Sequence, residues 1–365
     1  MNQEVYMPKI CKSQEPFADA SAENINAWIK QFTLWCTAQD EALVWLAFNL
    51  IKNQELSLKT LLLAKILAEI TLDANLLAAG LVYESFSNGE ISNLAIKTIL
   101  GSEVNSLVLS LQKIDLMLEV NSTLDYKIEL SEIDSQILGK MIFISEKDPR
   151  VIVIKLLIHL CAMRLSVNSD ESTKLKLAGQ VQKLFAPLSK HLNLPQINWE
   201  LEDLAFKFLQ PDMYKKIAIL LDKRRIEREV YILEIKQKLK KYLELHGIEA
   251  EVHGRPKHIY SIWVKMQRKL IDYNAIQDLH ALRVIVPHVM NCYTTLVLVH
   301  TLWQSVHQSF TDYISKPKSN GYESLHTNVT DSDGRILEVQ IRTRQMHQQA
   351  ESGIAAHWRY KDISI

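Results

Sequence analysis

Apolar residues recur at every third and fourth position through the front of the chain, from residue 20 to about residue 165. The segments AENINAWIKQFTLWCTAQDEALVWLAFNLI (22–51) and TLLLAKILAEITLDANLLAAGLVYESF (60–86) show this spacing, are rich in Leu and Ala, and contain no Pro. Such spacing is typical of amphipathic helices. We therefore expect an all-helical front part, followed by a polar loop over 166–173.

Proline and glycine then divide the middle of the chain. A further helical segment ends near Pro195, and a short helix stops at Pro211. From Asp212 to about His246 the pattern predicts one long charged helix, which Gly247 closes as a C-cap.

The pattern changes after residue 248 to short runs typical of β-strands. These runs are IEAEV (248–252), ALRVIVPHV (281–289), LHTNVT (325–330) and ILEVQIRT (336–343). Helical patterns cover 258–270, 293–306 and 344–359. Strands that alternate with helices predict a small α/β domain with a mostly central sheet.

Composition narrows the class of protein. The chain has 365 residues with 42 basic and 42 acidic side chains, so no global positive field favours nonspecific nucleic-acid binding, although local patches remain open. The four cysteines are far apart and form no CxxC, which fits a reducing cytoplasm. The first twenty residues show no signal peptide, and four charges interrupt the most apolar stretch, 56–82. That stretch predicts buried helices rather than a membrane span.

The segment GRPKHIYSIWVKMQRK, from Gly254, predicts an amphipathic helix. Its inward residues would be Ile259, Ile262, Met266 and Leu270. Its outer face would carry Lys257, Ser261, Lys265 and Lys269, with Arg255 just before the helix. Such a row suits a polyphosphate, but a solvated helix face explains it about equally well.

Polar residues lie within, or just before, two of the predicted strands. Asp278 stands just before an apolar strand and Arg283 lies within it. An Arg that points from the opposite face of a strand needs a partner or a ring to stack on. Taken alone, Asp278 is more often a cap or turn residue. In ILEVQIRT, Glu338 shares a polar face with Gln340 and Arg342, which either is solvated or lines a cleft. Two carboxylates on adjacent strands suit Mg²⁺.

The loop KPKSNGYESLHT (316–327) combines a turn with groups that bind rings and phosphates. Its Asn320-Gly321 step permits a positive φ, and Tyr322 follows as a platform for a base. The phosphate-binding candidates are Lys316, Lys318 and His326. The alternative is a hairpin with Tyr322 packed on its neighbour. Walker, HExxH and GxSxG motifs are absent, so any nucleotide site is of another kind.

Taken together, four segments closely resemble the synthetase domain of the RelA/SpoT family, across about 250–361. They are GRPKHIYSIWVKM, DLHALRVIV, YISKPKSNGYESLHT and EVQIRTRQMHQQAESGIAAHWRYK. The resemblance extends upstream over 185–214. It implies a GTP diphosphokinase of the stringent response, which transfers the β,γ-pyrophosphate of ATP to the 3′-hydroxyl of GDP or GTP to give (p)ppGpp and AMP. It further implies an α+β multidomain fold: an all-α HD-like domain over 1–185, a helical connector over 186–250, and a nucleotidyltransferase-like synthetase domain with a central mixed sheet over 251–365.

The resemblance also implies roles for the site residues. On the ATP side, Arg255 and Arg283 would stack on adenine, and Lys257, Ser261 and Lys265 would hold the phosphates. On the acceptor side, the guanine and phosphate contacts would come from Lys316, Lys318, Asn320, Tyr322 and His326. Asp278 and Glu338 would bind Mg²⁺, and Glu338 is the candidate base for the 3′-hydroxyl.

The front part departs from bifunctional relatives, whose hydrolase motifs have the forms LLAALLHDVVEDT and IKLADRLHNMR. Here the matching stretches are LLAAGLVYESFSNG and IKLLIHLCAMR. The replaced positions are Val82, Tyr83, Phe86, Ser87, Ile158 and Ala162. Apolar groups do not ligate Mn²⁺, and His159 falls on an Arg position, so we expect a degenerate pseudo-hydrolase, as in monofunctional RelA.

Two further departures leave questions open. Ser309-Phe310-Thr311-Asp312 fits neither the acidic EFDD of monofunctional members nor the basic RFKD of bifunctional ones, so GDP-versus-GTP preference is open. RelA-type proteins continue into domains that read the ribosome and tRNA, which predicts that this chain is a fragment or a short form. The alternatives are a bifunctional enzyme and a silent nucleotide-binding regulator; an allosteric (p)ppGpp site and the oligomeric state also stay open.

Overall fold

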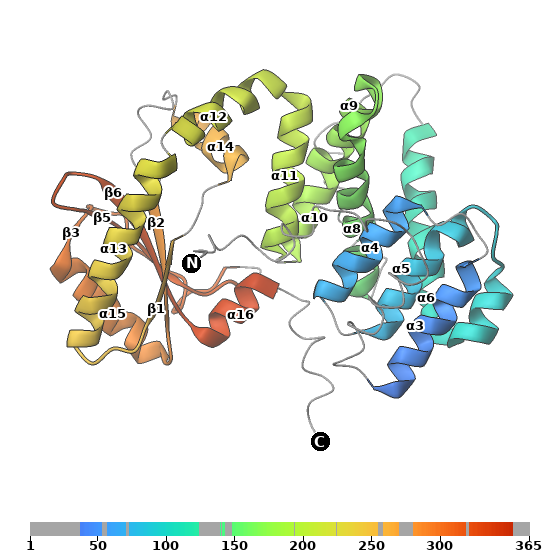
Figure 1. Cartoon of the computed structure of the whole chain (residues 1–365), viewed down its shortest axis with the longest axis horizontal. Coiled ribbons are helices and arrows are strands. Elements are labelled where there is room, and N and C mark those ends of the chain that lie inside the picture. Colours follow the sequence, from blue (N-terminus) through green and yellow to red (C-terminus); the bar gives the residue numbers. More distant parts are fainter. Residues whose placement is uncertain are drawn as a thin grey trace. The chain divides into compact units, whose positions relative to one another are not determined.

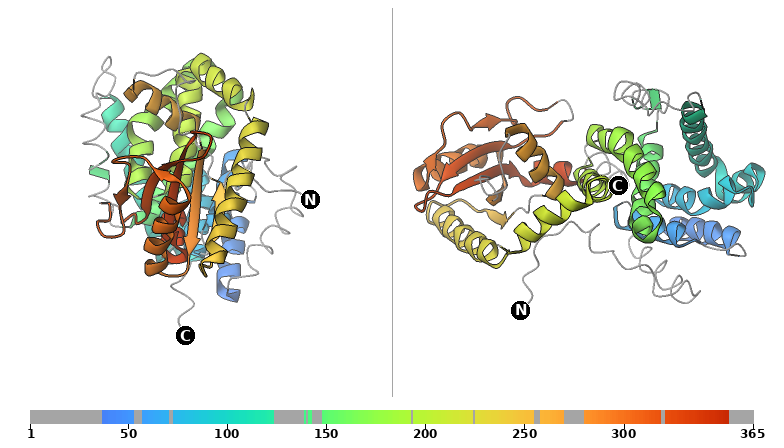
Figure 2. Two further views of the ribbon diagram at one scale, coloured as in Figure 1. Left: turned by 90° about the vertical axis from the view of Figure 1, so that its left-hand side faces the viewer. Right: turned by 90° about the horizontal axis from the view of Figure 1, so that it is seen from above.

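The computed structural model describes residues 37–52, 57–70, 73–123, 139, 141–142, 148–192, 194–223, 225–254, 258–269, 280–318 and 321–352. These residues fall into two compact units (Figures 1 and 2), one within Pro8–Ala205 and one within Phe206–Gly353. We name them the helical unit and the sheet unit. The division falls inside the segment that the sequence predicts as a helical connector.

The helical unit is built from helices alone in its described part. Its elements are α3 (Ala38–Ile51), α4 (Leu58–Ile70), α5 (Ala74–Ser87), α6 (Asn93–Thr123), α8 (Pro149–Leu165), the 3₁₀ turn η1 (Ser166–Asn168), α9 (Glu171–Gln180), the π-helical turn η2 (Val181–Phe185) and α10 (Ala186–His191). Helix α11 (Pro195–Leu209) leads into the sheet unit. The predicted all-helical front part is therefore confirmed over these residues.

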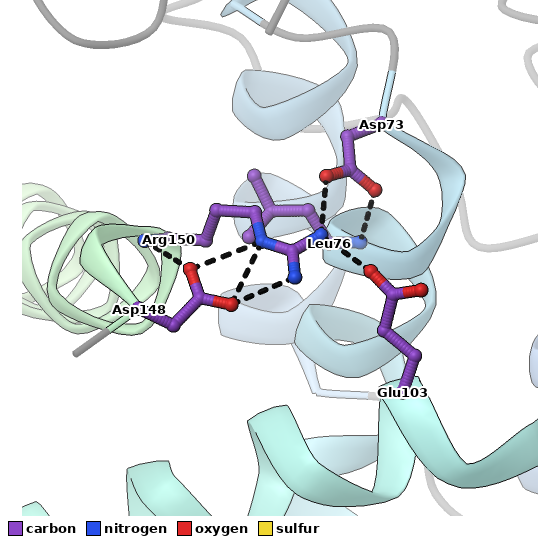
Figure 3. Close-up of polar contacts among 5 residues, drawn as sticks. All are labelled: Asp73, Leu76, Glu103, Asp148 and Arg150. Carbon is purple, nitrogen blue, oxygen red and sulfur yellow. Dashed lines mark hydrogen bonds and ion pairs between the residues drawn. The ribbon is translucent and has the colours of Figure 1, made fainter. Parts of the chain in front are cut away.

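Arg150, at the start of α8, binds carboxylates at the starts of α5 and α8 and within α6 (Figure 3). Asp73 caps α5 by accepting the Leu76 N–H (3.1 Å), and its other oxygen accepts from Arg150 Nη1 (2.8 Å). Arg150 also binds Asp148, the N-cap of α8, and Glu103 of α6 (2.7 Å each). Hydrogen bonds with these carboxylates, Asp148 first, raise the pKa of Arg150. The guanidinium therefore stays charged and links α5, α6 and α8.

Two helical segments, Asn93–Glu119 and Pro149–Asn168, are long and apolar enough to span a membrane by length and composition. Core helices of globular units pass the same test, and most apolar side chains of α8 are buried among other helices. The stretch 56–82, predicted as buried helices, contains α4 and the first part of α5. Most of their apolar side chains are buried, although Leu58 at the start of α4 is 53% exposed.

The sheet unit begins with α12 (Pro211–Lys223) and α13 (Arg225–Leu245). The structure thus assigns two helices where the sequence predicts one, with residue 224 outside the described residues. The predicted cap of α13 is confirmed: Gly247 has φ 71°, its N–H donates to Glu244 O (3.0 Å), and the Ile248 N–H donates to Leu243 O (2.9 Å). This pair of bonds closes the helix as a Schellman motif.

A mixed sheet follows. Its strands are β1 (Glu251–Gly254), β2 (His280–Val286), β3 (Gln304–Ser305), β4 (Thr311–Asp312), β5 (Leu325–Thr330) and β6 (Ile336–Thr343). The order is β1-β2-β6-β5-β3, with β4 also paired to β5. Among the described strands, β2 and β6 run parallel and the other pairs are antiparallel. The remaining helices of the unit are α14 (Ile259–Lys269), α15 (Val289–Leu302) and α16 (Arg344–Ser352).

One face of the sheet forms the core of the unit. Helices α13 and α15 lie against it (Figures 1 and 2), and their buried residues Leu239, Leu243 and Val299 meet Val284 and Val339 from the strands. The sequence predicts that the helix of α15 continues to 306, which is wrong. Trp303 is extended, 4% exposed in the same core, and Gln304 pairs with Thr330.

Candidate functional site on the polar face of the sheet

The other face of the sheet carries polar side chains that come from neighbouring strands. Arg283 of β2 lies opposite His253 of β1 and Gln340 of β6, and Gln340 in turn lies opposite His326 of β5. We call this surface the polar face; Glu338 and Arg342 of β6 belong to it too. Gln340 is 2% exposed and Arg342 1%, so β6 does not present a solvated face here. Of the two interpretations of this row, the structure excludes the solvated one at these two positions.

Glu338 is held on the polar face by its neighbours. Gln340 Nε2 donates to Glu338 Oε1 (2.7 Å), and His326 Nδ1 lies 3.9 Å from the same oxygen. The Glu338 side chain is 19% exposed, so it keeps an opening to solvent. A carboxylate held by a neutral amide donor stays able to accept a proton or bind a hard cation. Asp278, its predicted metal partner, lies outside the described residues.

The described residues contain no group of three or more His, Cys, Asp and Glu arranged to hold a metal ion. Of the carboxylates described on the polar face, Glu338 of β6 is 19% exposed, whereas Glu351 of α16 is paired with Arg283 and Arg342. Mg²⁺ commonly binds through one or two carboxylates and substrate phosphates, so this donor fits the predicted ion.

The loop before β5 places rings beside the polar face. The Tyr322 hydroxyl and His326 Nε2 are 2.8 Å apart, and the Tyr313 ring lies 5.2 Å from the His326 ring. Lys318 Nζ lies 4.5 Å from the Tyr313 ring and 5.0 Å from the Tyr322 ring. Gly321 has φ 75°, as the predicted turn requires. The structure therefore shows Tyr322 packed on its neighbours, within a cluster that also holds two phosphate-binding candidates.

A buried charge network, which sequence reasoning missed, lies on the same face. Glu351 of α16 accepts from Arg342 Nη2 (2.9 Å) and pairs with Arg283 Nη1 (3.0 Å). Burial alone would raise the pKa of Glu351, but Arg283 and Arg342 lower it. Burial and Arg342 lower the pKa of His347, whose Nδ1 lies 2.7 Å from Arg342 Nη2, to about 4. These side chains fix Arg283 within hydrogen-bond reach of α16.

Helix α14 has the predicted orientation where it is described. Ile262 is 2% exposed and packs with Phe206 and Ile217, and Ile259 and Met266 pack against the same cluster. Ser261 is exposed and Lys265 half-buried. The remaining predicted residues of this patch, and one from the loop, fall outside the described residues or have undescribed side chains: Arg255, Lys257, Lys269, Leu270 and Asn320.

Comparison with known proteins identifies both units. A family model described as "Region found in RelA / SpoT proteins" matches residues 254–364, and an HD domain model matches residues 46–194. A GTP pyrophosphokinase of Photobacterium angustum is 37% identical over 300 residues, which are 82% of this chain and 40% of that protein. One of Escherichia coli K12 is 35% identical with the same coverage. The chain belongs to the RelA/SpoT family.

The RelA/SpoT chain spans about two-fifths of the length of these relatives, since the match covers 40% of each.

The predicted fold class is confirmed, because the HD match lies in the helical unit and the RelA/SpoT match covers the mixed sheet. A crystal structure of small alarmone synthetase 1 from Bacillus subtilis is 28% identical, with a TM-score of 0.30, and covers 35% of this chain and 74% of that one.

In the HD region of this RelA/SpoT chain, the six positions that we expect to replace hydrolase residues range from buried to exposed. Val82 is 0% exposed and Tyr83 6%, while Phe86, Ile158 and Ala162 are half-buried and Ser87 is exposed. Glu84, the carboxylate between them, pairs with Lys59 at 2.8 Å. The motif stretch therefore offers apolar groups, hydroxyls and one carboxylate that is already ion-paired.

A lysine forms the centre of the neighbouring polar cluster. Lys155 of α8 is 5% exposed and pairs with Asp115 of α6, which also accepts from the Tyr83 hydroxyl. Burial lowers the pKa of Lys155 and Asp115 opposes that shift, while burial and Asp115 raise the pKa of Tyr83. No local pattern in the sequence predicts this cluster, because its members come from three helices.

His159 packs against an aromatic ring in the helical unit. Its ring stacks on Phe185 of η2, with centroids 3.6 Å apart and planes 27° apart. Its Nδ1–H donates to Lys155 O (2.9 Å), and burial lowers the pKa of His159 to about 3. The imidazole is therefore neutral at physiological pH and serves packing.

The unusual Ser309-Phe310-Thr311-Asp312 stretch borders the polar face. Thr311 is exposed and lies opposite His326, so both side chains belong to the same face. Asp312 Oδ1 instead accepts the N–H groups of Ile314 (2.8 Å) and Ser315 (2.9 Å). Burial would raise the pKa of Asp312, but these bonds lower it. Asp312 thus shapes the turn, whereas Thr311 lies beside His326 on the polar face.

Proposed function

We propose that the sheet unit is a (p)ppGpp synthetase, which transfers the β,γ-pyrophosphate of ATP to the 3′-hydroxyl of GDP or GTP. The observation that carries the proposal is Glu338, a partly exposed carboxylate held by Gln340 within reach of the Tyr322–His326 loop. In the proposed step the acceptor O3′ forms a bond to Pβ of ATP. The bond between Pβ and the oxygen that bridges it to Pα breaks, AMP leaves, and Glu338 takes the 3′-hydroxyl proton.

The name of the relatives, GTP pyrophosphokinase, supports this reaction. We assign the ATP phosphates to Ser261 and Lys265, together with Lys257, and the adenine to Arg283 and Arg255. Arginine suits the second role because its planar guanidinium stacks on aromatic faces.

On the acceptor side we assign guanine stacking to Tyr322, beside Asn320. Lys318 now lies 5.0 Å from the Tyr322 ring, so a stacking base would compete with it for that ring. A displaced Lys318 would then join Lys316 and His326 at the acceptor phosphates. The cation–π contact of the free protein therefore holds a phosphate-binding group close to its place of action.

Magnesium fits this arrangement through Asp278 and Glu338, and when bound it would neutralise charge on the phosphates. The chain's own contribution is positioning and electrostatic stabilisation. For the helical unit we propose no hydrolase activity, because Val82, Ile158 and Ala162 offer no ligand to Mn²⁺.

The test incubates the protein with labelled ATP, GDP and Mg²⁺, and separately with ppGpp and Mn²⁺. We expect ppGpp and AMP in the first reaction and no hydrolysis in the second. Absence of synthesis with nucleotide binding intact would favour the silent regulator, and Mn²⁺-dependent hydrolysis would favour the bifunctional enzyme.

A second experiment tests the role of Glu338. Glu338→Gln removes the charge but keeps the shape, so we expect synthesis to fall at least about 100-fold, the typical contribution of a general base, with ATP binding retained. Glu244→Gln, on the exposed surface of α13, is the matched control for loss of a carboxylate. Unchanged turnover in Glu338→Gln would remove Glu338 from this role.

A further inference from the structure

Glu351 lies at the centre of the charge network on the polar face. One oxygen, Oε1, meets Arg342 Nη2 at 2.9 Å and Arg283 Nη1 at 3.0 Å. All three side chains are enclosed, with exposures of 11% for Glu351, 8% for Arg283 and 1% for Arg342. The carboxylate therefore joins two adjacent strands, β2 and β6, to helix α16.

The network matters because of where Arg283 lies. Ala281 is opposite Glu338 in the β2–β6 ladder, and Arg283 is the next residue along β2 on the same face. Residues two apart on a strand are separated by roughly 7 Å. A long, flexible Arg side chain spans that distance, so Glu338 is an alternative partner for Arg283.

We propose that Glu351 is a positioning residue for the synthetase reaction: it anchors the Arg283 guanidinium to α16, in the orientation that receives the adenine of ATP, and keeps it away from Glu338. The inference rests on the proposed function, in which Arg283 stacks on adenine and Glu338 takes the proton. Fixing an Arg side chain before ATP binds removes an entropy cost that binding would otherwise carry.

His347 supports the same orientation from the other side. Its Nδ1 lies 2.7 Å from Arg342 Nη2, the nitrogen that also donates to Glu351. A neutral imidazole accepts from a guanidinium at this position, whereas a protonated one is repelled by it. Arg342 is thus held by two acceptors on α16, which in turn keeps Glu351 beside Arg283.

The test compares Glu351→Gln with Gln348→Ala, a change at an exposed position of the same helix. We expect Glu351→Gln to raise the KM for ATP and the Kd for ATP about tenfold, the loss of roughly one charged hydrogen bond. The KM for GDP should stay within about twofold, because Arg283, Arg342 and His347, the partners of Glu351 described above, are not acceptor residues. Glu351→Asp, which keeps the charge on a shorter stem, should fall between the wild type and Glu351→Gln.

A structural role alone would act differently. It would lower the melting temperature and raise the two KM values together, and that result overturns the inference, as does an unchanged KM for ATP. Because isothermal titration measures ATP binding without turnover, the proposed function fails separately if the wild type binds ATP but forms no product. In that case an unchanged ATP Kd in Glu351→Gln still overturns the inference, and a weakened one still supports it.

Discussion

We expect the substitution Lys155→Met to lower the stability of the helical unit. Lys155 is 5% exposed and pairs with Asp115, which also binds Tyr83, so one carboxylate joins α5, α6 and α8. Met keeps the apolar stem and removes the ammonium. Asp115 then keeps only the neutral Tyr83 hydroxyl of these two partners.

The magnitude follows from burial. Removing one partner of a fully buried ion pair costs about 3–5 kcal/mol. The Asp115 side chain is 34% exposed, and solvent screens the charge left behind, so we expect roughly 2–3 kcal/mol. For a unit of this size that corresponds to a fall in melting temperature of about 5–10 °C.

The assay is thermal unfolding followed by circular dichroism, with and without Mn²⁺ or EDTA. Lys97→Met, at an exposed position of α6, is the matched control and should change stability by less than about 0.5 kcal/mol. Since we assign no metal to this unit, Mn²⁺ should not raise the wild-type melting temperature. A stable Lys155→Met, or a clear Mn²⁺-dependent rise, would refute this reasoning.

Three further outcomes are expected. The neutral His159 has a pKa of about 3 in the fold against about 6.5 unfolded, so stability is lost as pH falls below 6.5, by about 2 kcal/mol at pH 5. His159→Gln should therefore flatten the dependence of the melting temperature on pH between pH 7 and 5. Parallel curves of melting temperature against pH for the wild type and the variant would contradict this. Arg150→Lys replaces a forked donor by a point charge that does not span three carboxylates, and should cost about 2 kcal/mol in urea unfolding; an unchanged midpoint would show that the contacts of Arg150 contribute little. Thr311→Lys should favour GTP over GDP in kcat/KM by about fivefold, from one added charge beside His326, with Thr311→Asp acting oppositely; equal ratios would separate Thr311 from acceptor choice.

The strands at the centre of the site follow directly from the sequence. In β5 and β6 the alternation of apolar and polar residues matches the ladder, with Leu337, Val339 and Ile341 in the core and Glu338 and Gln340 on the other face. Here a local period of two and burial on one face agree. Gly247 was predictable for a similar reason, because a left-handed cap is a local requirement.

Contacts between residues far apart in the sequence explain why the end of α15 and the role of Glu351 were not predicted. The apolar run before Trp303 keeps a helical spacing, but Gln304 pairs with Thr330 and so leaves the helix. Glu351 gave no signal because one of its partners, Arg283, lies on a distant strand. A charged residue on a short polar helix is usually solvated, and only the folded position of α16 makes this one a buried partner.

Variants in one unit also test whether that unit controls the other. Lys155→Met acts on the helical unit and should leave the KM values of the synthetase unchanged if the units work independently. Glu351→Gln acts on the sheet unit and should leave unfolding of the helical unit unchanged. A change in synthetase kcat caused by Lys155→Met would therefore report coupling, because the described ion-pair partner of Lys155, Asp115, belongs to the helical unit. The same variant that tests the metal-free packing of the helical unit thus tests whether that unit controls the synthetase.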